Sequence, residues 1–197
     1  MDAAEVRTGG RPRDEAIDER ILDEAMIEFA RRGLEGFNLG AVARRAGVAK
    51  NSIYLRWPHR EDLVRAALLR AHTFDELQQT GDLAADLTHL AHVLAAFFAT
   101  DGGLASSYQL WVAMQADPEL ATWGAEQIAR PVQKFAEQVI ASAQERGEAN
   151  PAADPVVLSR LLIGGIQSEA VLPPSGQLPP GFLDAVVQSI LKLATSP

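Results

Sequence analysis

The sequence predicts an all-α protein, and two observations carry that prediction. Ala, Leu, Glu, Gln and Arg dominate the stretches between breaks, whereas runs of β-branched residues are scarce. Ten of the eleven prolines fall where a helical pattern has already ended, and only Pro131 lies inside a long periodic stretch. At 197 residues and 47% hydrophobic content the chain can bury a substantial core, so we expect about nine packed helices.

The first helix is expected over about residues 14–32. Its early turns are acidic and its last turn carries Arg31 and Arg32, which suits the helix dipole at both ends. Gly33 is a natural stop after it. One apolar stripe at helical spacing contains Ile17, Ile21, Ala25 and Phe29.

Two short helices separated by a glycine follow. Asn38 is predicted to cap a helix over residues 39–46, Gly47 to allow a sharp turn, and residues 49–57 to form the next helix before Pro58. Small alanines in the first of the two helices allow a close crossing. This pattern is typical of a helix-turn-helix, in which the second helix presents its outer face to the major groove of DNA.

The outer face of the helix over residues 49–57 carries groups that suit base and phosphate contacts. Lys and Arg pair with phosphate or guanine, Asn bridges adenine, an exposed Leu meets a thymine methyl, and hydroxyls reach phosphate. The alternative is a tight helical hairpin with a merely polar surface. The residues concerned are Lys50, Asn51, Ser52, Tyr54, Leu55 and Arg56.

Charge is divided unevenly along the chain. The net charge is −8, which by itself argues against nucleic acid as a partner. Residues 31–70, however, hold nine Lys and Arg side chains against three Asp and Glu, whereas residues 71–197 hold five against fourteen. A basic segment of this size is a candidate phosphate-facing surface, although a charge run alone fits a solvated face equally well.

Several function classes are disfavoured by what the sequence lacks. There is no cysteine, which excludes a disulfide framework and a thiol nucleophile. No Gly-x-Ser-x-Gly, His-Glu-x-x-His or Gly-rich phosphate loop occurs, so we expect no enzyme. His89, His92 and nearby Asp86 are too weak a signal for a metal site. We predict no cofactor, no metal and no membrane span, and a cytoplasmic location.

Residues 11–69 resemble the N-terminal DNA-binding region of TetR-family transcriptional regulators. The resemblance rests on GRPR at 10–13, ILDEAMIEFARRGLEGF at 21–37 and NLGAVARRAGVAKNSIYLRWPHREDLV at 38–64. It implies a three-helix DNA-binding domain with a helix-turn-helix, a C-terminal helical domain for ligand binding and dimerisation, and a homodimer. It also implies repression that is relieved when a small molecule binds.

The resemblance also suggests which side chains meet DNA. Asn38 matches a helix cap beside a phosphate, Arg60 a phosphate-binding cation, and Arg11 and Arg13 an arm that some members lay in the minor groove. Gly40 and Ala41 depart from the family pattern, as do Asn51 and Leu55, so the operator sequence cannot be inferred. The predicted DNA-binding set is Arg11, Arg13, Asn38, Arg44, Lys50, Asn51, Ser52, Tyr54, Leu55, Arg56 and Arg60.

The rest of the chain is expected to form one acidic helical domain. We predict a flexible arm over 1–13, a DNA-binding domain over 14–59, and a ligand-binding and dimerisation domain over 60–197. The fourth helix is expected to run from Arg60 to about Gln79 and to link the two halves. A fifth spans 83–100, a sixth ends near Pro118, and a seventh extends to Gly147 with a bend near Gly124 and Pro131.

The last two predicted helices, about residues 154–172 and 181–194, are apolar on more than one side. Gly164 and Gly165 lie inside the first of them and each costs about 1 kcal/mol relative to Ala, which indicates a close helix approach. Burial within one subunit is the alternative. The resemblance implies that these two helices make the homodimer interface, and a twofold dimer suits paired operator half-sites.

Aromatic and soft side chains gather in the middle of the acidic part. Ligand pockets are mostly apolar with few polar groups, although aromatics at helical spacing fit a plain core as well. The predicted ligand-binding set is Phe74, His92, Phe97, Tyr108, Trp111, Met114, Gln115, Trp123 and Phe135.

Taken together, we expect a sequence-specific DNA-binding regulator, a repressor released from its operator by a small molecule. Its partners would be double-stranded operator DNA, an unidentified small-molecule effector and a second copy of the chain. A helical module whose basic hairpin contacts another protein remains an alternative. The sequence does not distinguish repression from activation.

Overall fold

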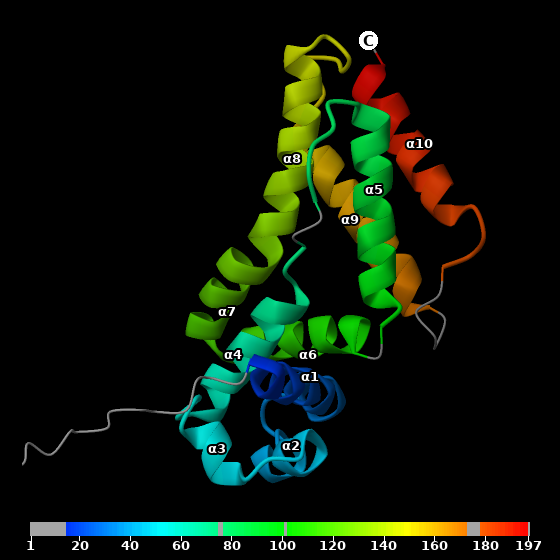
Figure 1. Cartoon of the computed structure of the whole chain (residues 1–197). Coiled ribbons are helices and arrows are strands. Elements are labelled where there is room, and N and C mark those ends of the chain that lie inside the picture. Colours follow the sequence, from blue (N-terminus) through cyan, green and yellow to red (C-terminus); the bar gives the residue numbers. More distant parts are fainter. Residues whose placement is uncertain (1–14, 75–76, 101, 173–177, 197) are drawn as a thin grey trace, which may run out of the picture.

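The computed structural model describes residues 15–74, 77–100, 102–172 and 178–196. All regular structure in these ranges is helical, which confirms the predicted all-α class. The helices are arranged as a small lower unit, formed by the first four, and a taller upper unit (Figure 1). In chain order they are α1 (Glu15–Arg32), α2 (Leu39–Ala46), α3 (Lys50–Tyr54), α4 (Arg60–Ala71), α5 (Leu83–Phe98), α6 (Gly103–Ala116), α7 (Pro118–Gly124), the π-helical turn η1 (Ala125–Ala129), α8 (Arg130–Glu145), α9 (Pro155–Val171) and α10 (Phe182–Thr195).

The lower unit is built around a core that α1 crosses. The predicted stripe of α1 packs there, with all of its members but the half-buried Ile17 fully inside, against Val42 of α2, Ile53 of α3 and Leu63 of α4. Burying such side chains contributes roughly 1.5–3 kcal/mol each. The same core continues upward, because Leu110 of α6 and Ile128 of η1 belong to it. The two units are therefore joined by shared apolar packing.

The turn between α2 and α3 forms as predicted. The Asn38 side chain accepts hydrogen bonds from the backbone N–H groups of Gly40 and Ala41, at 2.9 and 3.1 Å. Gly47 ends α2 with φ of +68°, a left-handed conformation that glycine adopts without steric cost. The turn is closed by a hydrogen bond from Val48 N–H to the Ala43 carbonyl, at 3.0 Å. Regular α3 is shorter than expected, ending at Tyr54.

The fourth helix differs from the prediction, since α4 ends at Ala71 and not near Gln79. The Thr73 hydroxyl donates to the Leu69 carbonyl at 2.7 Å, a local hydrogen bond of the kind that competes with helix continuation. Phe74 then packs into the upper core. Farther along, the buried Asp86 carboxylate accepts hydrogen bonds from both the backbone and the hydroxyl of Thr80. No continuous helix therefore joins the two units.

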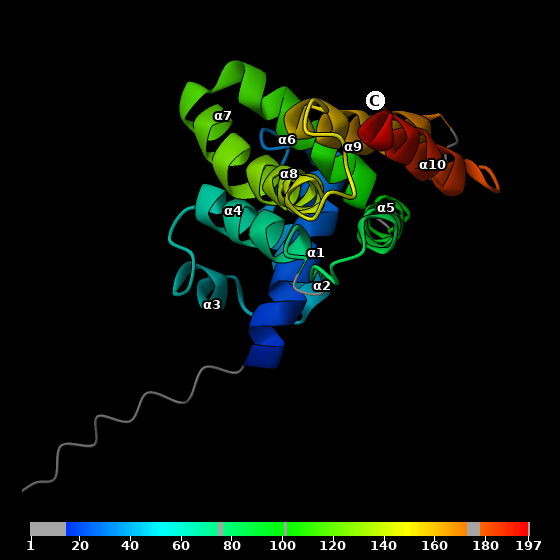
Figure 2. The same ribbon diagram turned by 90° about the horizontal axis from the view of Figure 1, so that it is seen from above.

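The upper unit is a bundle of α5, α8, α9 and α10 around a second core. Leu90, Ile140, Leu162 and Ile166 are fully buried in it. Seen from above, α9 and α10 lie on the side of the molecule away from α3 (Figure 2). Asp154 caps α9 as predicted, accepting from Val156 N–H at 2.8 Å.

The predicted bend near Gly124 and Pro131 is a π-helical turn. α7, η1 and α8 follow one another without a loop, so the expected seventh helix exists as a bent series. Pro131 has no N–H to continue the α-helical ladder, which favours a break just before it. At Gly124 an added Cβ would lie 2.8 Å from the Met114 sulfur, so glycine permits α6 and α7 to pack closely.

Within the described residues, no single helix is both long and apolar enough to cross a membrane. By length and composition alone, α5 and α6 meet that test only as a pair, and the pair is bent by 83°.

Candidate nucleic-acid interface and ligand cavity

The surface of α3 presents several of the predicted reading residues to solvent. Ile53 is fully buried and anchors the helix on the lower core. Lys50 and Asn51 are exposed, and Leu55, just beyond the helix, is 86% exposed. The Lys50 ammonium lies 5.6 Å from the centre of the Tyr54 ring, which pre-orients both side chains. This face can offer cationic, amide, hydroxyl and apolar groups to a groove.

Arg56 points in a different direction. Its Nε forms an ion pair with the Asp18 carboxylate of α1, and its Nη1 donates to the Ser52 carbonyl at 3.0 Å. The side chains of Arg56 and Asp18 are only 18% and 19% exposed. The guanidinium therefore ties α3 to α1, whereas the sequence alone had suggested a DNA contact.

A second ion pair fixes α2 on α1. Arg45 contacts Glu24 at 2.5 Å and Glu28 at 3.0 Å, and Glu28 is a buried carboxylate. A buried charge without a partner is costly, so this pairing is required for α1 and α2 to pack as they do. Both attachments hold the helix-turn-helix at a set angle to α1.

The remaining predicted phosphate contacts are at the surface. Asn38 uses its side-chain oxygen as the cap of α2 and is exposed, which leaves its amide N–H groups toward solvent. Arg44 is exposed, and Arg60 pairs with neighbouring Glu61 at 2.7 Å. Arg11 and Arg13 lie outside the described residues.

Ion pairing reduces the basic character that the sequence suggested for residues 31–70. Arg65 of α4 pairs with Glu119 of α7 at 3.3 Å, and Arg70 lies within reach of Glu19 and Asp23 of α1. Together with Arg45, Arg56 and Arg60, most cations of the segment thus have carboxylate partners. The free positive charge is concentrated on fewer side chains than the count implied.

An inner cavity of about 220 Å³ lies where the two units meet. Its wall comes from the end of α4, from α5 and α6, from the bent α7–η1–α8 series and from α9. Leu110 and Ile128, which belong to the lower core, also form part of this wall. The lining residues are His72, Phe74, Leu94, Phe97, Phe98, Ser107, Leu110, Trp111, Met114, Gly124, Ile128, Ala129, Val132, Gln133, Ile163 and Gln167.

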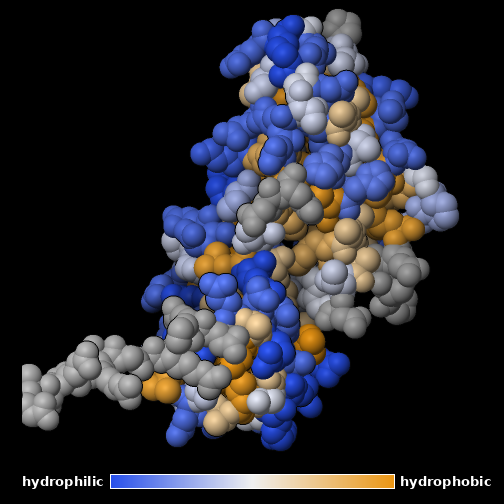
Figure 3. Space-filling view, viewed as in Figure 1, coloured by the Kyte–Doolittle hydropathy of each residue, from blue (hydrophilic) through white to orange (hydrophobic). Residues whose placement is uncertain are grey.

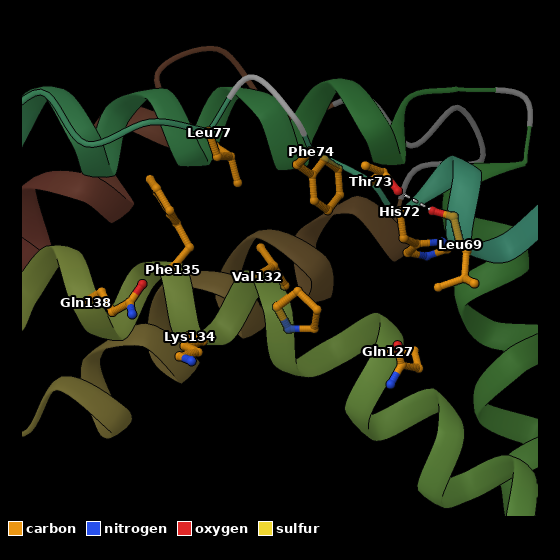
Figure 4. A pocket seen from close by; sticks show the side chains of 11 residues that line it. Leu69, His72, Thr73, Phe74, Leu77, Gln127, Val132, Lys134, Phe135 and Gln138 are labelled. Carbon is orange, nitrogen blue, oxygen red and sulfur yellow. Dashed lines mark hydrogen bonds between the residues drawn. The ribbon is translucent and has the colours of Figure 1, made fainter.

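An outer cleft of about 420 Å³ adjoins the inner cavity and shares His72, Phe74 and Val132 with it. Phe74 and Leu77 extend from the segment after α4 toward Val132 and Phe135 of α8 (Figure 4). Polar side chains also line this cleft, namely Thr73, Gln127, Lys134 and Gln138. In the space-filling view, apolar side chains reach the surface in the middle of the molecule, while its upper end is mainly hydrophilic (Figure 3).

His72 stands at the end of α4, between cavity and cleft. Its Nδ1 lies 2.9 Å from the Leu68 carbonyl oxygen, and its ring centre lies 4.6 Å from that of Phe97. Burial lowers the pKa of His72, and the hydrogen bond to Leu68 offsets only part of this effect. The imidazole is therefore neutral near pH 7, with Nδ1–H as donor and Nε2 as acceptor.

The predicted ligand-binding residues are only partly brought together. Phe74, Phe97, Trp111 and Met114 line the inner cavity, and Phe135 lines the outer cleft. His92 lines a separate hollow beside the start of α10. Trp123 instead packs beneath Arg65, with 5.5 Å between the guanidinium and the ring centre. Tyr108 and Gln115 are exposed on α6 and line neither the inner cavity nor the outer cleft.

His72, Gln133 and Gln167 are cavity residues that the sequence did not single out. Each has further polar residues close to it in the sequence and no spacing that marks it, so only the fold shows that the three face the same space. Among the described residues, no group of three His, Cys, Asp or Glu side chains could hold a metal ion.

Comparisons with known proteins match both halves of the chain. Residues 77–190 match the family model described as tetracyclin repressor-like, C-terminal domain, and residues 21–67 match bacterial regulatory proteins, tetR family. YdeS of Bacillus subtilis, named an uncharacterized HTH-type transcriptional regulator, is 28% identical over 159 residues, or 80% of this chain and 79% of YdeS. The DNA-binding transcriptional repressor TetR of Mycobacteroides abscessus is 36% identical over 78 residues, or 38% of this chain and 40% of that protein.

Solved structures give the same result for the fold. Salmonella enterica GusR superposes with a TM-score of 0.71 at 19% identity, covering 92% of this chain and 97% of GusR. The relatives are named as regulators, and none of these names describes an enzyme. Because one family model alone spans more than half of the residues, the chain belongs to the TetR family of DNA-binding transcriptional regulators.

Proposed function

We propose that this regulator is a repressor that leaves its operator when a small molecule binds the cavity between its two units. The observation that carries the proposal is the shared position of Leu110 and Ile128. Both side chains are buried in the core that supports the helix-turn-helix, and both line the inner cavity. A ligand that displaces them changes the packing beneath the DNA-binding surface. The named repressor from Mycobacteroides abscessus supports repression as the direction of control.

The coupling proceeds through side-chain packing, because α4 ends at Ala71. Two routes reach α4 from the cavity wall. One is the lower core itself, and the other is α7, where Trp123 and Glu119 both contact Arg65 of α4. A ligand shifts the balance between two arrangements only by binding one of them more tightly. Operator DNA must then weaken ligand binding by the same factor as ligand weakens DNA binding.

We further propose that two copies assemble through α9 and α10. On α9 the exposed Val157, Leu161 and Leu172 share a face with Gly164, and α10 adds the exposed Leu193. An added Cβ at Gly164 would meet no atom within 4 Å inside this subunit. The predicted close approach at that glycine is therefore not made within one chain, which supports a neighbouring copy as its partner. A twofold dimer places two α3 helices on paired half-sites.

For DNA, we assign base reading to Lys50, Asn51, Tyr54 and Leu55, and phosphate contacts to Asn38, Arg44 and Arg60. Ser52 is half-buried, and we assign its hydroxyl to a phosphate contact as well. Arg56 is assigned to positioning, since it is paired with Asp18. Arg11 and Arg13 remain proposed minor-groove contacts.

Since α4 packs in the lower core, we propose that the DNA-binding domain ends after Ala71. We also propose a cytoplasmic location, beside the chromosome.

The proposal is tested by a mobility-shift assay with DNA from upstream of the gene that encodes this chain. We expect a specific complex whose affinity falls steeply as salt rises. Changing Lys50 or Tyr54 to Ala removes roughly 1–3 kcal/mol of specific binding each, with unchanged thermal unfolding. If the protein binds no promoter-containing fragment in a salt-sensitive way, DNA binding is rejected. Nuclease footprinting distinguishes DNA binding from the alternative that the basic hairpin contacts another protein. A reporter fusion shows whether the operator is repressed or activated.

A further inference from the structure

In the part of the chain that the structure describes, the inner cavity is lined without formally charged side chains. Of the described residues that line it, none is Asp, Glu, Lys or Arg. Transfer of an unpaired ion from water into such an environment is strongly unfavourable. Lys134 lines only the outer cleft and is exposed to solvent there. Among the described lining residues of the inner cavity, a charged ligand would meet only neutral polar groups, such as the Gln133 and Gln167 amides, and no carboxylate, ammonium or guanidinium group.

The aromatic side chains of the cavity form one connected group around Phe97. The Phe74 ring meets Phe97 edge-on, with centres 5.8 Å apart and planes at 89°, and Phe98 is tilted at 5.4 Å. His72 contacts Phe97 from another side. Trp111 completes this wall. It is 60% exposed, so a bound ligand can bury part of its ring. Rings in these orientations favour edge-to-face and offset contacts with a further flat ring.

His72 adds a directional polar contact. A carbonyl oxygen only accepts hydrogen bonds, so its Nδ1 must carry the proton that is donated to Leu68. Nε2 then has a free lone pair, and no hydrogen bond to it occurs among the described residues. This acceptor calls for a donor on the ligand. The Ser107 hydroxyl, by contrast, already donates to the Gly103 carbonyl at 2.9 Å.

The cavity volume limits the size of the ligand. An apolar cavity of about 150 Å³ is large enough to bind benzene. The inner cavity, at about 220 Å³, has room for one or two fused rings. A longer substituent would pass His72 and Phe74 into the outer cleft, where Gln127 and Gln138 can solvate it.

We infer that the inner cavity binds an uncharged, flat aromatic compound of one or two rings whose hydroxyl or N–H donates a hydrogen bond to Nε2 of His72. This inference rests on the proposed function of the cavity as the effector site. It adds the chemical class of the effector and names His72 as the residue that selects it.

The test compares four probes of similar size by isothermal titration with the full-length protein. They are 2-naphthol, 2-methoxynaphthalene, 2-naphthoate and a quaternary naphthylammonium. We expect saturable binding of 2-naphthol, with 2-methoxynaphthalene about three- to tenfold weaker because it has no donor. The anion and the cation should bind at least a hundredfold more weakly. These four measurements need no variant, so they are independent of any folding defect.

Two substitutions locate the selective contact. His72→Phe keeps an aromatic ring but removes the acceptor, so 2-naphthol and its methyl ether should bind equally well. His92→Phe is the matched control, because His92 lines a different hollow, and it should preserve the preference. Circular dichroism checks that both variants fold.

Several results would overturn the inference. They are tighter binding of either charged probe, an unchanged preference in a folded His72→Phe variant, or no saturable binding of any aromatic probe. Mobility shifts run in parallel keep the two proposals apart. Probe binding that leaves the operator complex intact contradicts ligand-controlled release and leaves the assigned ligand class standing. Release by a charged compound alone contradicts the ligand class and leaves the release mechanism standing.

Discussion

The DNA-binding surface and the cavity differ in how their side chains are held. Around α2 and α3, ion pairs to α1 fix the angle of the helices, with Arg45 on Glu24 and Glu28, and Arg56 on Asp18. Around the cavity, apolar packing is left incomplete, and His72 presents a hydrogen-bond acceptor among a few neutral polar side chains. A surface that must match a fixed DNA geometry benefits from rigid attachments. A site that must respond to a ligand benefits from unfilled space that the ligand itself completes.

The largest expected effect comes from removing the pairing of subunits that aligns two DNA-binding surfaces. Leu161→Glu places a charge on the apolar face of α9, where the wild-type side chain is 51% exposed in the single chain. We expect the subunit to fold, the dimer to dissociate at micromolar concentration, and operator affinity to fall by more than about a hundredfold, because one half-site is then lost. Light scattering and mobility shifts measure both.

Glu126→Gln, on η1 and away from α9, serves as the control and should leave a dimer. A Leu161→Glu protein that is still dimeric would contradict the proposed interface.

The next effect tests whether the two regions are joined through the shared core. Leu110→Ala removes a buried side chain common to the lower core and the cavity, and should lower the free energy of unfolding by about 2–4 kcal/mol. It should also reduce the mutual effect of ligand and operator on each other's affinity. Denaturant unfolding gives the first quantity and titration with and without operator gives the second.

Leu120→Ala is the matched control, since Leu120 is buried in the same core but does not line the inner cavity. It should destabilise to a similar extent and preserve the coupling. Equal loss of coupling in both variants would mean that stability alone, and not the shared wall, carries the signal.

A smaller effect is expected from releasing α3. Asp18→Asn weakens the hold on Arg56 and should reduce specific operator affinity by about 1 kcal/mol, with little change in the salt dependence because no phosphate contact is lost. Arg44→Ala is the comparison, because loss of an exposed cation that meets a phosphate should lower the salt slope by about one. If Asp18→Asn also lowers the salt slope, a phosphate contact has been lost with the ion pair. That result would mean that Arg56 contacts DNA in the wild-type protein.

The smallest effect concerns pH. His72 has its pKa lowered in the folded state, so below about pH 6.5 the unfolded chain takes up a proton more readily than the folded one. Stability is therefore unaffected by His72 above that range and decreases as pH falls through it. We expect His72→Phe to show a smaller loss of unfolding free energy between pH 7.5 and 5.5 than the wild type does. Equal losses would show that His72 is accessible to protons when folded.

Local signals in the sequence were sufficient for the N-terminal caps of α2 and α9 and for the turn after α2. Asn38, Gly47 and Asp154 each perform a task that depends on the backbone next to them, so their residue types predicted the caps and the turn. The end of α4 at Ala71 was missed, because it depends on where Phe74 and Asp86 pack in the upper unit.

The candidate sites were harder to predict for the same reason. The direction of Arg56 depends on Asp18, 38 residues away, and a helical pattern cannot indicate which exposed-looking cation is paired. The cavity draws its wall from helices spread over almost a hundred residues. Its aromatic residues were partly recognised by type, but His72 and the two glutamines became identifiable only from the arrangement of the helices.

The π-helical turn η1 has a consequence for how this family member tolerates change in length. A π-helical turn holds one residue more than an α-helical turn, so deleting one residue from 125–129 would rewind η1 as regular α-helix and leave α7 and α8 roughly in place. Trp123 would then stay beside Arg65, whereas Ile128, which lies inside η1, would lose its place in the lower core and on the cavity wall. Loops between helices can change in length without moving the helices that they join. A change in length within η1, which is not a loop, moves a side chain of the core. The number of residues between Gly124 and Pro131 therefore decides whether Ile128 reaches both the core beneath the DNA-binding surface and the wall of the cavity.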